Sequence, residues 1–160
     1  MNATTRRFAK KFTALAALPI AAALTLSACG EEETETSFTN SQNGIEITMT
    51  YTAVGDEVTK QTTTNEIDYE AAGLGGKEEA QQMFDPVVEQ AADVEGYEQS
   101  IEYGDTSATE EVSIDYEVAD LEELANVPGY EGSANMAEGD YISLDESRTM
   151  LEEAGFTEVE

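Results

Sequence analysis

Alternating hydrophobic and polar positions predict two pairs of β-strands. In the first pair, residues 45–51 alternate, and a Thr-rich strand follows from about Glu57 to Tyr69 after a turn at 54–57. In the second, the apolar positions of 101–103 and 112–118 flank a Gly-Asp turn. A period of two is that of a strand with one buried face, and a short polar turn between two such strands is typical of a β-hairpin.

Three segments have the spacing of helices. The first lies after Lys77, where apolar residues form one stripe in which Pro86 is expected to kink or divide the helix. A short helix is capped by Asp120 and stopped by Pro128, and a last one starts at Ser143, in a Ser-Leu-Asp-Glu capping box. We therefore expect an α+β fold: a two-layer sandwich in which an antiparallel sheet of two β-hairpins carries helices on one face, in ββαββαα order.

The first 28 residues have the pattern of a secretion signal. Four basic residues precede an apolar run at 12–24, which is shorter than the roughly 20 residues of a membrane-spanning helix. Leu26-Ser27-Ala28-Cys29 then matches the bacterial lipobox. This match implies cleavage between Ala28 and Cys29, a diacylglyceryl group on the Cys29 thiol and acylation, typically with palmitate, of the new amine. Two acyl chains are enough for stable anchoring.

The segment after the anchor is acidic and rich in Thr and Ser, and it contains few apolar residues. Such a composition favours an extended, flexible chain. We therefore expect three parts: a signal peptide at 1–28, the lipidated Cys29 with an acidic flexible tether at 29–42, and a single α+β domain at 43–160.

Composition argues against several classes of function. Removal of the leader leaves three basic against 35 acidic residues, so nucleic acid binding is disfavoured. The chain has no histidine, and its one cysteine is Cys29, which disfavours the usual zinc, copper and iron sites and the common nucleophile–base pairs. We therefore predict no enzyme activity, no catalytic or metal-binding residues and no cofactor. The acids are expected to form a solvated surface that could also attract cations or a basic partner.

Three features allow a binding role beside a structural one. Each predicted strand ends in an apolar-x-Tyr unit, and the tyrosines either close the two ends of the core or form an aromatic rim for a sugar or peptide. Antiparallel order is expected to place Tyr51 and Tyr103 at one end and Tyr69 and Tyr116 at the other. Threonines of the second strand are compatible with edge-strand docking, and the acidic loop 129–140 with weak cation binding.

Segments along most of the chain resemble the YehR-like family of small bacterial lipoproteins, whose function is not established. The more specific matches are Asp85-Pro86 in the first helix and Tyr141-Ile142-Ser143-Leu144 at the start of the last. The resemblance implies a two-layer α+β sandwich and provides no catalytic residues. The chain differs in having acids where relatives commonly have lysines.

Together these features predict a noncatalytic lipoprotein of the cell envelope. Its lipid anchor on Cys29 would hold it on the extracytoplasmic face of the cell membrane, or on an outer membrane where the cell has one. The domain would bind an envelope protein or serve a structural role. The alternative is a small-ligand or cation-binding lipoprotein that uses loop 129–140 or a tyrosine rim.

Overall fold

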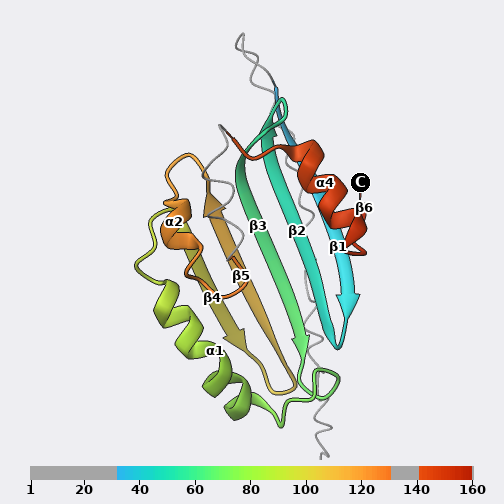
Figure 1. Ribbon diagram of the computed structural model, residues 1–160. Helices are drawn as coiled ribbons and strands as arrows, with labels where there is room; N and C mark the ends of the chain where they lie inside the picture. Colours follow the sequence, from blue (N-terminus) through green and yellow to red (C-terminus); the bar gives the residue numbers. More distant parts are fainter. Residues whose placement is uncertain (1–31, 131–140, 160) are drawn as a thin grey trace, which may run out of the picture. The chain divides into compact units, whose positions relative to one another are not determined.

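The computed structural model describes residues 32–130 and 141–159, which form one antiparallel sheet and three helices (Figure 1). The strands are β1 (Glu33–Gln42), β2 (Ile45–Val54), β3 (Glu57–Asp68), β4 (Tyr97–Tyr103), β5 (Ser107–Asp115) and β6 (Thr157–Val159). The helices are α1 (Lys77–Ala91), α2 (Leu121–Leu124) and α4 (Leu144–Glu153). The expected α+β class and both predicted hairpins, β2–β3 and β4–β5, are confirmed.

The strands lie in the order β4-β5-β3-β2-β1-β6, and every neighbouring pair is antiparallel. The two predicted hairpins meet through β3 and β5, which makes β3 a central strand. Docking at an edge formed by its threonines is therefore wrong. β6 extends the sheet beyond β1, so the last strand of the described residues pairs with the first.

The residues assigned to a flexible tether contain a full strand of the sheet. β1 pairs with β2 along ten residues, and Phe38 at its centre is fully buried. The turn between them is Asn43-Gly44, with φ of 52° and 77°. Positive φ at both central positions is the geometry of the tightest hairpins, in which Asn-Gly is strongly preferred. The tether prediction is wrong for residues 33–42, because pairing with β2 and one buried aromatic ring stabilise a segment that is otherwise polar.

All three helices lie on one face of the sheet, as expected (Figure 1). α1 and α2 lie beside β4 and β5, α4 lies beside β1 and β2, and β3 runs between the two groups (Figure 1). Pro86 lies inside a continuous α1 and does not divide it. It replaces an amide that would have bonded to residue 82, and both positions are exposed, so water can satisfy the freed carbonyl.

The start of α4 is attached to the turn of the β2–β3 hairpin. Ser143 caps the helix by accepting a hydrogen bond from the Glu146 amide, which is half of the predicted capping box. The amide of Asp145 donates to the Asp56 carboxylate at 2.9 Å, and the amide of Leu144 donates to the Asp56 carbonyl at 2.8 Å. These bonds lower the pKa of Asp56, the one from Asp145 contributing most. They hold α4 over the sheet.

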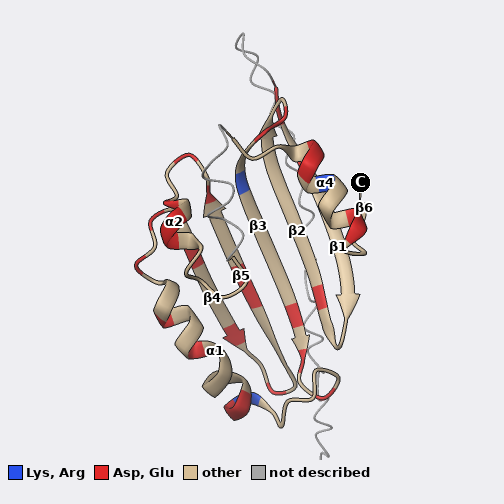
Figure 2. Ribbon diagram, viewed as in Figure 1, with Lys and Arg blue, Asp and Glu red and all other residues tan. Residues whose placement is uncertain are grey.

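The strand register separates two chemically different faces. Residues paired across strands share a face, so Phe38, Met49, Thr63, Val112 and Gln99 form one row on the helix-bearing side. The opposite face of β1–β5 has no apolar residue except Val54 and consists mainly of Thr, Ser, Glu and Asp. No described helix covers that bare face (Figure 1). Acids are spread over strands, helices and loops alike (Figure 2).

The apolar core under the helices is divided into separate clusters. One lies beneath α4 and contains Phe38, Tyr51, Ala53, Val58, Ile142 and Leu144. A second lies beneath α2 and the end of α1 and contains Ala91, Tyr97, Val112, Ile114, Leu124 and Val127. A third, beneath the start of α1, contains Tyr69, Ala80 and Ala108. The first includes Val58 of β3, and Tyr116 packs against both the first cluster and the second.

The tyrosines that end the predicted strands belong to these clusters rather than to a rim. Tyr51 and Tyr69 are buried, and Tyr103 and Tyr116 pack against the core. Their expected pairing is wrong: Tyr51 shares a cluster with Tyr116, and Tyr69 shares one with Tyr103. The reason is that β3 and β5 are antiparallel, so the turns of the two hairpins lie at opposite ends of the sheet.

Candidate functional site

Polar side chains occupy the middle of the helix-bearing face, where a core would normally continue. They come from the central strands: Gln61, Thr63 and Asn65 of β3, Gln99 of β4 and Glu110 of β5, and we call these five residues the polar seam. Gln61 and Thr63 are only 5% and 6% exposed. Burial of polar groups is costly unless they are hydrogen-bonded, so the partners of each determine what the seam can do.

Gln61 forms a closed network at one end of the polar seam. The Tyr116 hydroxyl donates to its Oε1 at 2.8 Å, and its Nε2 donates to the Thr63 hydroxyl at 3.2 Å. Burial is the main cause that raises the pKa of Tyr116 far above its ordinary value, and burial raises the pKa of Tyr51 to about 12. Both phenols therefore stay neutral at physiological pH. This end of the polar seam has paired hydrogen bonds and serves as a structural link between the clusters.

Glu110 forms the other end and differs from every other acid on β1–β5. It is the single charged residue among the helix-facing positions of the described strands β1–β5, in phase with Val112 and Ile114. Its carboxylate accepts from Asn65 Nδ2 through Oε2 and from Gln99 Nε2 through Oε1, each at 2.5 Å. It is partly exposed. Two neutral amides from neighbouring strands thus fix the orientation of a carboxylate that water can still reach.

Three tyrosines, Tyr97, Tyr103 and Tyr130, lie near enough to this carboxylate for its charge to act on them. Tyr97 and Tyr130 meet edge to face, with ring centroids 5.6 Å apart. Burial raises the pKa of both far above the ordinary phenol value, and the negative charge of Glu110 raises each further. Tyr103 responds to Glu110 in the same direction after larger effects of burial and of Asp85, which accepts its hydroxyl at 2.7 Å. The negative charge of Glu110 therefore acts on these tyrosines, but the tyrosines carry no positive charge that could neutralise it.

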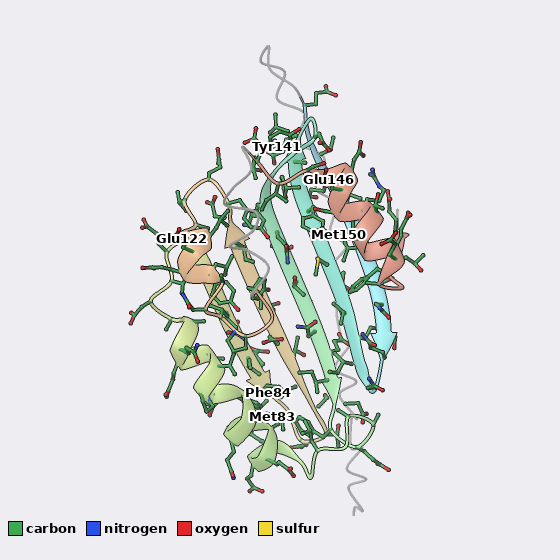
Figure 3. All side chains as sticks on the ribbon, in the orientation of Figure 1. Met83, Phe84, Glu122, Tyr141, Glu146 and Met150 are labelled. Carbon is green, nitrogen blue, oxygen red and sulfur yellow. The ribbon has the colours of Figure 1, made fainter. Side chains whose placement is uncertain are left out.

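Across the sheet, α4 presents an exposed surface beside the polar seam. Met150 is 53% exposed and lies on the side of α4 that faces the middle strands (Figure 3). With Asp145, Glu146 and Thr149 it lines a shallow hollow of about 440 Å³. This hollow contains apolar surface and acids but no buried polar group, so the more specific recognition chemistry is at Glu110.

The residues singled out from the sequence have different outcomes. Ala28, Cys29 and residues 131–140 of the acidic loop lie outside the described residues, so cleavage, lipidation and cation binding there stay predictions. A rim built from the strand-end tyrosines is wrong. Sequence reasoning missed Glu110, although an acid two and four positions before Val112 and Ile114 was a signal that it faces the helices.

The described residues provide neither a metal site nor a membrane-spanning helix. Within residues 32–130 and 141–159, His, Cys, Asp and Glu side chains form no group of three that could hold a metal ion. In the same ranges, no helix has the length and hydropathy needed to cross a bilayer.

Comparison with known proteins places the chain among bacterial lipoproteins. Residues 33–157 match the family described as protein of unknown function DUF1307. An uncharacterized lipoprotein of Listeria innocua, Lin0239, is 41% identical over 138 residues, which cover 86% of this chain and 89% of that protein. The uncharacterized lipoprotein YehR of Escherichia coli is 34% identical over 152 residues, which cover 94% of this chain and 99% of YehR.

Solved structures agree with the fold. The NMR structure of E. coli YehR matches with a TM-score of 0.70 at 33% identity, over 81% of this chain and 93% of that one. A Streptococcus pneumoniae protein matches with a TM-score of 0.59 at 16% identity, over 98% of this chain and all of that one, and supports the fold alone. The family match begins with β1, in agreement with its place in the sheet. The chain belongs to the DUF1307 family, the YehR-like lipoproteins.

Proposed function

We propose that this chain is a membrane-anchored lipoprotein of the cell envelope whose folded unit is a noncatalytic binding protein, with the Glu110 end of the polar seam as its binding site. The signal-like leader and the lipobox at Cys29 support the anchor, and relatives along nearly the whole chain are named lipoproteins.

The observation that carries the proposal is the fixed carboxylate of Glu110. Two neutral amides hold it by hydrogen bonds, and no basic side chain of the described residues pairs with it. Apolar residues of similar size, such as those at the neighbouring positions Val112 and Ile114, would continue an ordinary core. A carboxylate that is oriented by two amides, partly exposed and close to tyrosines instead has the features of a recognition site.

The same geometry supports a noncatalytic role. Acid–base hydrolysis by carboxylates uses two of them at a defined separation across the reacting bond. Among the helix-facing positions of the described strands β1–β5, Glu110 has no second acid beside it. One hydrogen-bonded carboxylate can bind and orient a group but cannot supply both halves of that reaction.

The anchor is tested by metabolic labelling with an alkyne analogue of palmitate in a bacterial host. The native chain is expected to carry the label and to sediment with membranes, whereas C29S should lose both properties. S27A keeps a small residue in the lipobox and is the matched control, which should remain labelled. A C29S protein that still carries the label would contradict the anchor.

The binding site is tested by photocrosslinking of the lipidated protein in intact cells. Ile47 and Thr48 are neighbours on β2, both partly exposed, and lie on opposite faces of the sheet. Ile47 is in the same row as Asn65 and Glu110. A benzophenone amino acid at 47 should give a discrete adduct, while one at 48 should not. Equal adducts from both positions, or none from 47, would overturn the site.

A further inference from the structure

We propose that the group recognised at Glu110 is a primary ammonium carried by an organic molecule. This inference rests on the proposed function and identifies the chemical class of its ligand. It follows from three properties of the site: an uncompensated negative charge, acceptors without donors, and aromatic rings.

The charge of Glu110 has no basic partner among the described residues. Only three of them are basic. Arg148 pairs with Asp145 and Glu158 at 2.7 and 2.8 Å, and Lys77 Nζ donates to the Tyr103 carbonyl at 2.9 Å. Lys60 lies on the bare face, paired across the strands with Thr52 and Asp115. A ligand cation would supply the missing positive charge.

The site also has more acceptors than donors. A carboxylate offers about four lone-pair positions, and Asn65 and Gln99 fill one on each oxygen. The amide Oε1 of Gln99 is buried and accepts no hydrogen bond from any described residue. A buried acceptor left without a donor destabilises the free protein, so a donor from a ligand is favourable there. A ligand that carries both N–H groups and a positive charge would pair with the charge of Glu110 and donate to the free acceptors.

The aromatic rings narrow the choice of cation. The faces of tyrosine rings attract organic cations. A divalent metal instead requires several oxygen ligands at short range, and the described residues gather no such set. A quaternary ammonium suits the rings but has no N–H to donate. A primary ammonium, with three N–H donors on an aliphatic chain, fits the carboxylate, the amide oxygen and the rings.

The test is calorimetric titration of the lipidated full-length protein in nonionic detergent at about 0.15 M salt, where surface charge is largely screened. n-Pentylamine is the probe, and 1-pentanol and tetramethylammonium are its controls, lacking the charge and the N–H donors respectively. Pentylamine should bind with one-to-one stoichiometry, and each control at least about tenfold more weakly. Cadaverine and Nα-acetyl-lysine methylamide then distinguish a free diamine from a lysine side chain as the natural source.

A matched pair of variants locates the binding. Glu110 and Glu111 are adjacent, and the second lies exposed on the bare face. E110Q should weaken pentylamine binding at least about tenfold, and E111Q should leave it unchanged. Equal losses in both would mean diffuse attraction to an acidic protein and would overturn the proposal. If E110Q does not fold, the comparison of pentylamine with tetramethylammonium on the native chain decides alone.

The result also separates this inference from the proposed function. If pentylamine does not bind while the photocrosslinker at 47 still gives its adduct, the ammonium assignment is wrong and the binding site remains. If neither is found, the binding function itself is wrong.

Discussion

At the residue scale, a few polar side chains decide how the helix-bearing face is used. Gln61 is nearly fully buried in the centre of the sheet, yet both ends of its amide have partners. Glu110, two rows away on β5, has a negative charge without a basic partner among the described residues, and its two amide donors leave some of its lone pairs unfilled. The same seam therefore contains one end that stabilises the fold and one end that is free for recognition.

The structural end can be tested by Y116F. This change removes the donor to Gln61 Oε1 and leaves a buried carbonyl without a partner. The free energy of unfolding is expected to fall by about 1–3 kcal/mol, measured by urea denaturation. The hydroxyl of Tyr141 is exposed and makes only one long hydrogen bond, to Asp56 at 3.4 Å, so Y141F should change stability by less than about 0.5 kcal/mol. Similar losses in the two variants would show that Gln61 does not depend on Tyr116.

Burial of tyrosines predicts a loss of stability in alkali. The pKa of Tyr51 is about 12 in the folded chain, above its ordinary value of 10.0, because burial disfavours the phenolate. The unfolded chain therefore releases this proton first, so stability is intact below pH 10 and falls as pH rises from 10 towards 12. Urea denaturation across this range should show the decline, and Y51F should make it shallower. A flat profile would mean that the phenol ionises equally well in the folded state.

At the element scale, β1 shows what local patterns can and cannot predict. The two hairpins, three helices and the Ser143 cap followed from alternation, helical spacing and capping chemistry, which are local properties. β1 has one apolar residue in ten, so its composition resembled a tether. Its strand character comes from pairing with β2 and from the Asn43-Gly44 turn, a signal present in the sequence. The Glu110 site was harder to predict because it depends on the register between β3, β5 and β4.

The role of β1 is tested by F38A. Phe38 is fully exposed to solvent in a tether but fully buried in the sheet, where its ring meets Tyr51 edge to face at 6.1 Å. The substitution should lower the free energy of unfolding by about 3–5 kcal/mol. Thr39 is the next residue and lies on the bare face, so T39A should have a much smaller effect. Unchanged stability in F38A would mean that this segment does not contribute to the fold and is a tether after all.

At the scale of the folded unit, the acids are distributed by face. The bare face of β1–β5 is polar and rich in carboxylates, and only Lys60 is basic there. The helix-facing side of the same strands has one acid, Glu110. This contrast makes Glu110 more selective than the negative net charge of the protein. A negative surface attracts any cation, whereas an oriented carboxylate near tyrosine rings selects a cation by its shape and its N–H donors.

The excess of acids also predicts how salt changes stability. With 35 acidic and seven basic residues in the whole chain, like charges crowd the folded state more closely than the unfolded one. Raising ionic strength from about 0.01 M to about 1 M shortens the Debye length from about 30 to about 3 Å and screens this repulsion. The thermal unfolding midpoint should therefore rise with NaCl, most steeply at low concentration, and by the same amount with KCl. Exposed ion pairs, which salt weakens, are few by comparison, since among the described residues they are confined to Arg148. A midpoint that fell with salt would mean that such attractive pairs outweigh the repulsion, and the acidic surface would then be a stabilising feature rather than a cost that the fold tolerates.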